Sequence, residues 1–102
     1  MTKRKYSVFL GNVGSCSDRY CAAYGRKYSV KELFQRIATI PKLSGVDLVL
    51  TPELLDEFDV VKSMLQSTGL TVVSVAVDHF TQEKWKQGSF SAPDPAIRRA
   101  AV

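Results

Sequence analysis

Three apolar runs alternate with polar stretches of helical pattern along the chain. The runs are Tyr6–Val13, Val46–Thr51 and Leu70–Val77, and each passes into polar residues at its end. Short apolar runs separated by helical stretches are typical of parallel α/β proteins. We therefore predict an α/β fold built as a parallel βαβαβ segment.

The stretches between the runs carry helix signals. Ser29 and Glu32 have the spacing of a capping box, in which each side chain bonds the backbone of the other residue. Apolar side chains then recur at helical spacing until Pro41, which ends the first predicted helix. A second helix is predicted over about 56–67, with Gly69 placed as its C-cap.

The third run is nearly all β-branched or small, which is typical of a strand covered on both faces. A further helix is predicted to begin at Asp94-Pro95, with an N-cap followed by proline at the first helical position. Three parallel strands with two full helices leave too few helices to cover both faces of a sheet. We therefore expect residues 1–102 to form a single, incomplete domain, truncated from a larger α/β barrel.

Composition narrows the class of protein. The chain has 102 residues, of which 45% are hydrophobic and 24% charged, as in globular proteins. No apolar run approaches the roughly 20 residues that span a bilayer, so we expect a soluble, cytoplasmic protein without a membrane partner. The net charge is +4, with basic residues concentrated at 3–5 and mixed with acids elsewhere. Because nucleic-acid binders usually cluster their basic residues, no nucleic-acid partner is expected.

The first long loop, from Gly11 to Tyr28, holds Cys16, Cys21 and the pair Asp18-Arg19. Two cysteines and a single histidine are too few for a zinc site of four ligands. The spacing permits a disulfide, but a cytoplasmic setting favours two unpaired thiols. We expect the Asp18-Arg19 pair to hold this loop over the mouth of the fold.

Candidate chemistry follows the third run directly. Asp78 and His79 come where that strand ends, and ligands of parallel α/β proteins lie beyond the carboxyl ends of the strands. His79 could move a proton near neutral pH or bond a substrate oxygen, and Asp78 could orient it. The alternative is a loop pair satisfied by local backbone.

Three further residues are candidate substrate-binding groups. Glu53 follows the second strand and could bind hydroxyls, although N-capping of the second helix is an equal alternative. Asn12 lies near the end of the first run and could bind a ligand in the same way as Glu53. Trp85 could stack on the apolar face of a ligand, and burial as a loop anchor is at least as well supported.

These residues lie within stretches that resemble a known family. The first run ends in Gly-Asn-x-Gly-Ser, and the later stretches read GVDLVLTPELL and TGLTVVSVAVDHF. The most specific stretch is Trp-Lys-x-Gly-Ser-Phe-Ser-x-Pro-Asp-Pro-x-Ile-Arg, from Trp85 to Arg98. The chain resembles the amino-terminal part of the xylose isomerase-like TIM barrels, the sugar isomerase and epimerase group. The resemblance covers nearly the whole chain after Tyr6, which would supply the first three units of a (β/α)8 barrel.

The resemblance implies an activity for the intact enzyme. Family members bind divalent magnesium, manganese, cobalt or zinc, which polarises oxygens of an open-chain aldose or ketose, sometimes phosphorylated. His79 and Asp78 would then be catalytic, and Glu53, Trp85 and Asn12 would bind the sugar. Most metal ligands would lie outside this chain, so no metal ligand is assigned within it. The segment alone is not expected to turn over substrate. A homo-oligomer is compatible with the resemblance.

Two rival functions come from other classes. The same barrel superfamily includes metal-dependent abasic-site endonucleases, which would need a basic surface facing DNA. The other rival is a non-catalytic α/β interaction module, because strands without neighbours expose edges that can pair with another chain.

Overall fold

A computed structural model describes residues 3–14 and 25–102 of the chain. Its helices and strands follow one another in this order: β1 Tyr6–Phe9, the 3-10 helix η1 Leu10–Val13, α1 Val30–Ala38, β2 Leu43–Leu50, α2 Pro52–Asp56, α3 Phe58–Thr68, β3 Thr71–Val77, the 3-10 helix η2 Glu83–Trp85, and α4 Pro95–Ala100. The strands pair in the order β1-β2-β3, and both pairings are parallel. The predicted α/β class and parallel strand order are therefore confirmed.

Several element boundaries differ from the sequence prediction. Strand β2 begins at Leu43, three residues before the predicted run Val46–Thr51. The first apolar run is a strand only as far as Phe9, because the chain then turns into η1 and buries Leu10 against the helices. The helix predicted over 56–67 is α3, and a short helix that was not predicted, α2, precedes it. Glu57 lies between them with φ −105° and ψ 31°, which breaks the helical path.

The helix ends follow the predicted capping chemistry. Ser29 and Glu32 form the capping box of α1, and the Asp94 carboxylate accepts a hydrogen bond from the amide of Ala96 at the start of α4. Gly69 ends α3 with φ +70°, a left-handed conformation that glycine adopts without strain. Within the described residues, no helix is long and apolar enough to cross a membrane.

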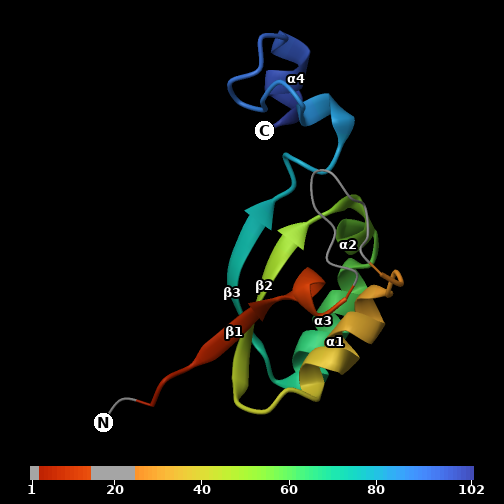
Figure 1. The fold of residues 1–102 in the computed structure, drawn as a ribbon, viewed down its shortest axis with the longest axis vertical. Helices are drawn as coiled ribbons and strands as arrows, with labels where there is room; N and C mark the ends of the chain where they lie inside the picture. Colours follow the sequence, from red (N-terminus) through yellow and green to blue (C-terminus); the bar gives the residue numbers. More distant parts are fainter. Residues whose placement is uncertain (1–2, 15–24) are drawn as a thin grey trace.

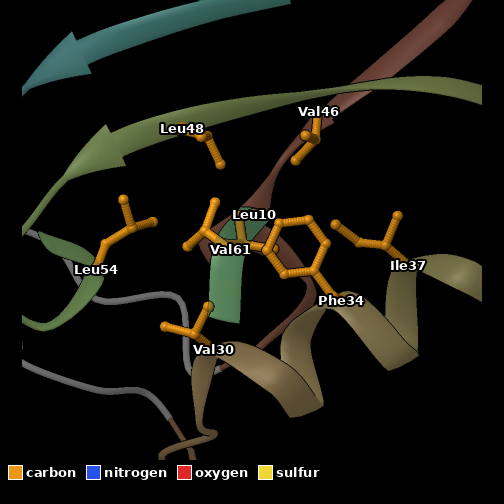
Figure 2. Packing of buried hydrophobic residues seen from close by; sticks show 8 residues of the cluster. All are labelled: Leu10, Val30, Phe34, Ile37, Val46, Leu48, Leu54 and Val61. Atoms are coloured by element: carbon orange, nitrogen blue, oxygen red, sulfur yellow. The ribbon is translucent and has the colours of Figure 1, made fainter. Parts of the chain in front are cut away.

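One face of the sheet carries the core. Helices α1, α2 and α3 all lie on the same side of the strands (Figure 1). The three most deeply buried side chains are Phe34 and Ile37 of α1 and Val46 of β2. Figure 2 shows that they meet side chains from η1, β2, α2 and α3, so the core joins every helix of this layer to the central strand.

The opposite face has a polar centre. Asp47 of β2 accepts hydrogen bonds from the hydroxyls of Ser7 on β1, at 2.7 Å, and Ser74 on β3, at 2.6 Å. The Ser74 hydrogen bond, followed by that of Ser7, lowers the pKa of the Asp47 carboxyl below its ordinary value. This face therefore holds a charged residue bonded across all three strands.

A register shift makes this arrangement. Val46 pairs with Val72 and Asp47 pairs with Ser74, so Val73 is an extra residue in β3. Gly45 makes room for it, because a Cβ there would lie 2.4 Å from Cγ2 of Val73. The shift therefore places Ser74, and not Val73, opposite the carboxylate.

Strand β3 differs from its prediction. Its sequence favours coverage on both faces, but six of its seven residues are exposed, including Val73, Val75 and Val77. The physical reason is that the helical layer ends over β2, and the chain after β3 leads α4 away from the sheet (Figure 1).

The core predicts a sharp contrast between two phenylalanines. Phe34 is completely buried and Phe58 is 56% exposed. We expect Phe34→Ala to lower the free energy of unfolding by about 3–5 kcal/mol, because it removes packed surface and leaves a cavity. Phe58→Ala, the matched control, should change it by about 0.5 kcal/mol.

Urea unfolding followed by circular dichroism measures both. If Phe34→Ala abolishes the folded baseline, Ile37→Val gives a graded version with an expected loss of about 0.5–1.5 kcal/mol. Equal effects of the two phenylalanine substitutions would contradict the assignment of the core.

Candidate functional site

A hollow of about 310 Å³ lies at the carboxyl ends of β1 and β2. Its polar lining comes from segments far apart in the sequence: Asn12, Lys27, Thr51, Glu53 and Thr81. Its aromatic lining comes from Phe9, Tyr28 and Phe80. A concave site with apolar walls and a few converging polar groups is the usual form of a small-molecule site.

Glu53 reaches this hollow because of how α2 begins. Strand β2 ends at Leu50, and the Thr51 hydroxyl caps α2 by accepting from the amide of Leu54 at 3.3 Å. Pro52 then fixes the first helical position. Glu53 is thus in the first turn of α2 and is not its N-cap. The cap is Thr51, which fixes where the helix begins and therefore where the Glu53 side chain lies.

Lys27 faces Glu53 across the hollow. Its Nζ lies 3.7 Å from Oε1 of Glu53, and the two side chains are 78% and 63% exposed. An ion pair this open to solvent contributes little to stability. Both groups are therefore available to a ligand that carries hydroxyl or carbonyl oxygens.

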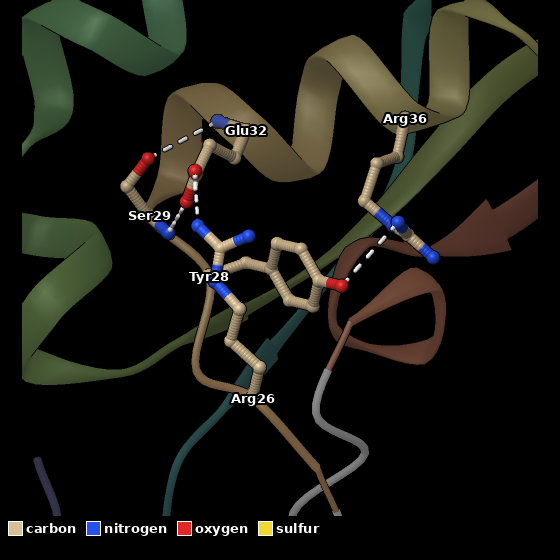
Figure 3. A network of polar contacts seen from close by, with 5 residues as sticks. All are labelled: Arg26, Tyr28, Ser29, Glu32 and Arg36. Carbon is tan, nitrogen blue, oxygen red and sulfur yellow. Dashed lines mark hydrogen bonds and ion pairs between the residues drawn. The ribbon is translucent and has the colours of Figure 1, made fainter.

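The segment that brings Lys27 and Tyr28 to the hollow is tied to α1. The Glu32 carboxylate accepts from the amide of Ser29 at 2.8 Å and from the guanidinium of Arg26 at 2.7 Å. The amide of Glu32 in turn donates to the Ser29 hydroxyl at 3.2 Å (Figure 3). The capping box therefore also fixes the chain that precedes the helix.

The Tyr28 ring is held by two arginines. The guanidinium groups of Arg26 and Arg36 lie 4.7 and 4.6 Å from its ring centroid. Arg36 also donates to the Tyr28 hydroxyl at 3.5 Å (Figure 3). Its Nε donates to the carbonyl of Val13 in η1. Arg36 thus links the aromatic wall of the hollow to η1, which follows the first strand.

Asp78 is buried where β3 ends, and its carboxylate organises the next turn. It accepts from the amides of Phe80, at 3.4 Å, and Thr81, at 3.0 Å, and also from the Thr81 hydroxyl. These bonds hold Phe80 and Thr81, which line the hollow. Asp78 therefore acts on the site through the residues that it positions.

His79 lies in an aromatic cluster beyond β3. Its ring centroid is 4.8 Å from that of Trp85 and 5.2 Å from that of Phe90. Trp85 is buried, as the loop-anchor alternative predicts, and it lines a neighbouring hollow of about 320 Å³. Phe80 and Thr81 line both hollows, so the two sites share a wall.

The structure thus brings together two of the five predicted site residues, Asn12 and Glu53. Asp78 supports their hollow from behind, and His79 and Trp85 belong to the adjacent cluster. Sequence reasoning missed Lys27 and Tyr28. Their position immediately before the capping box was the available signal, because residues ahead of a helix N-cap often lie at the strand ends of parallel sheets.

The described residues contain no group of three or more histidine, cysteine, aspartate or glutamate side chains that could hold an ion. Cys16, Cys21 and the Asp18-Arg19 pair lie outside the described residues, so the predictions for them stay predictions.

The network around α1 predicts a dependence of stability on pH. The backbone hydrogen bond from Ser29 and the charge of Arg26 lower the pKa of Glu32 below its ordinary value. A lowered folded-state pKa contributes stability that is present above the unfolded value, about 4.3, and is lost as the pH falls through the folded value. We expect Glu32→Gln to remove this part of the acid sensitivity.

Thermal unfolding of both proteins between neutral and acidic pH measures the effect. The difference in melting temperature between wild type and Glu32→Gln should shrink as the pH falls below the unfolded value. Asp59→Asn, at an exposed position in the first turn of α3, is the control. A difference that stays constant with pH would contradict the linkage.

Comparison with known proteins leaves the family open. No model of a known protein family and no curated protein sequence matches the chain. The resemblance to xylose isomerase-like barrels therefore stays a prediction.

Proposed function

We propose that the hollow at the carboxyl ends of β1 and β2 binds a small polyhydroxylated molecule of the open-chain sugar class. One observation carries the proposal: Asn12, Thr51 and Glu53 converge with Lys27 against aromatic walls. An amide, a hydroxyl, a carboxylate and an ammonium together offer donors and acceptors for several hydroxyls. Tyr28 and Phe80 offer surfaces for the C–H faces of such a molecule.

We further propose that the chain is the amino-terminal three units of a sugar isomerase or epimerase barrel. Sequential parallel strands with helices on one side are the arrangement of a barrel wall, whose other face points inward. The Ser7–Asp47–Ser74 layer supports this proposal, because a face packed under helices would favour apolar residues. In this proposal most metal ligands belong to further strands, His79 serves proton transfer, and Asp78 supports it by holding the turn that follows β3.

Binding of sorbitol, an acyclic polyol, tests the site. We expect sorbitol to shift the amide resonances of residues that line the hollow. Glu53→Gln should weaken binding about tenfold or more, because a hydrogen bond to a charged group contributes roughly 1.5–3 kcal/mol. Asp56→Asn removes an exposed carboxylate from the same helix outside the hollow and should leave binding unchanged.

Two outcomes would count against this site. One is a set of shifts that maps away from the hollow, and the other is equal weakening by both substitutions. In an intact enzyme, unchanged turnover by His79→Ala would contradict the role proposed for that residue.

A second function, an interaction module, is favoured by β3. This edge strand, Thr71–Val77, has no charged residue and no proline, the features that usually protect sheet edges. Its valines are exposed on both faces, with Val75 and Val77 each 53% exposed. We propose that a second strand, from another copy of the chain, can pair with this edge.

Sedimentation equilibrium tests the pairing. We expect the wild type to associate as its concentration rises and Val75→Lys/Val77→Lys to stay monomeric, since charges on an edge strand oppose pairing. Leu55→Lys/Phe58→Lys adds the same charge at equally exposed apolar positions on α2 and α3 and should still associate. A wild type that is monomeric at every concentration would exclude this function.

A further inference from the structure

A basic hollow lies at the end of the sheet opposite the proposed sugar site. Lys3, Arg4 and Lys5 precede β1, and Lys42 lies in the turn before β2; together they line a hollow of about 640 Å³. Figure 1 shows the amino-terminal segment and this turn at the end away from the arrowheads of the strands. The fold thus brings Lys42 to the same hollow as three cations that are adjacent in the sequence.

These four cations account for the net charge of the molecule. The chain has 14 lysines and arginines and 10 acidic residues, so the ten basic residues elsewhere are balanced by ten acids. Among the described residues that line the hollow there is no carboxylate. The positive potential is therefore concentrated at this end, where it would attract a polyanion.

Lys42 is held in an unusual conformation. Its φ is +69°, and it is the only described residue other than glycine with a positive φ. Such a position suits glycine or asparagine, and most other residues, lysine among them, are strained there. Residues held in strained conformations cluster at functional sites, so a lysine kept here supports a role for its charge.

An exposed aromatic ring lies among the cations. Tyr6, the first residue of β1, is 51% exposed and lines the same hollow. Single-stranded nucleic acids bind where lysines and arginines meet the phosphates and aromatic rings stack on the bases. An anionic membrane would instead favour an apolar helical face next to the cations, which this concave surface does not offer.

We propose that this hollow binds single-stranded nucleic acid. The four cations contact the phosphates, and the Tyr6 ring stacks on a base. The proposal opposes the expectation, from the scattered charges of the sequence, that nucleic acid is not a partner. It is independent of the sugar site, because the two surfaces lie at opposite ends of the sheet and share no lining residue.

Fluorescence anisotropy with a labelled oligothymidylate tests the proposal. Four phosphate contacts on a single strand predict a slope of about −3 in log affinity against log salt. Affinity should therefore fall by roughly 50-fold between about 50 and 200 mM salt. Tyr6→Leu should lower affinity about fivefold or more and leave the slope unchanged, since it removes stacking and no charge.

A matched pair of variants separates the hollow from overall charge. Lys5→Gln/Lys42→Asn removes two of the four cations and should halve the slope and lower affinity roughly 10- to 100-fold at low salt. Asparagine accepts a positive φ, so this variant should keep its fold, as circular dichroism would verify. Lys31→Gln/Lys62→Gln makes the same change in net charge on the exposed surfaces of α1 and α3 and should retain wild-type binding.

Three results would overturn the proposal. The first is an oligothymidylate affinity with a salt slope shallower than about −1. The second is an equal loss of affinity in the two double variants, which would assign binding to net charge. The third is binding to phosphatidylserine vesicles without binding to the oligonucleotide, which would assign the surface to membranes.

Discussion

The structure depends on one contact, the packing of α1 against the central strand. Phe34 and Ile37 on the helix and Val46 on β2 are the most deeply buried side chains, and the other members of the core surround them. The capping box that starts α1 also fixes the segment before it, which carries Lys27 and Tyr28 to the mouth of the sheet. The same helix therefore makes the core and positions one side of the candidate site.

The two faces of the sheet serve different purposes. The helical face is apolar and buried over β2, whereas the other face holds Asp47 with a serine on each side. A carboxylate that is satisfied by two hydroxyls can be covered at a lower desolvation cost than a bare one. This face is therefore suited to being covered by further protein, although it is polar at its centre.

The alternation of apolar runs and helical stretches was sufficient to predict the α/β class, the parallel order and the caps at Ser29, Gly69 and Asp94. The caps depend on residues that are close in the sequence, and the class and the parallel order follow from the alternation of strand and helix along the chain. The break at Glu57 and the early end of β1 were not predicted. Both depend on how Leu10 and Leu54 enter a core assembled from distant segments.

The candidate site was predicted only in part for the same reason. Glu53 and Asn12 follow strands, so their place at the mouth follows from the parallel topology. Lys27 enters through the capping network, and Lys42 joins the basic hollow through the turn before β2. These are contacts between segments, which periodicity within one segment does not report.

The extra residue in β3 determines which side chains meet across the sheet. Side chains alternate along a strand, so a one-residue shift exchanges the two faces of everything that follows. Had Val73 paired with Asp47 without the shift, the residues from Ser74 to Val77 would each face the other side of the sheet. A methyl group at position 45 would collide with Val73, so the absence of a side chain at Gly45 is a condition for the register that the rest of β3 follows.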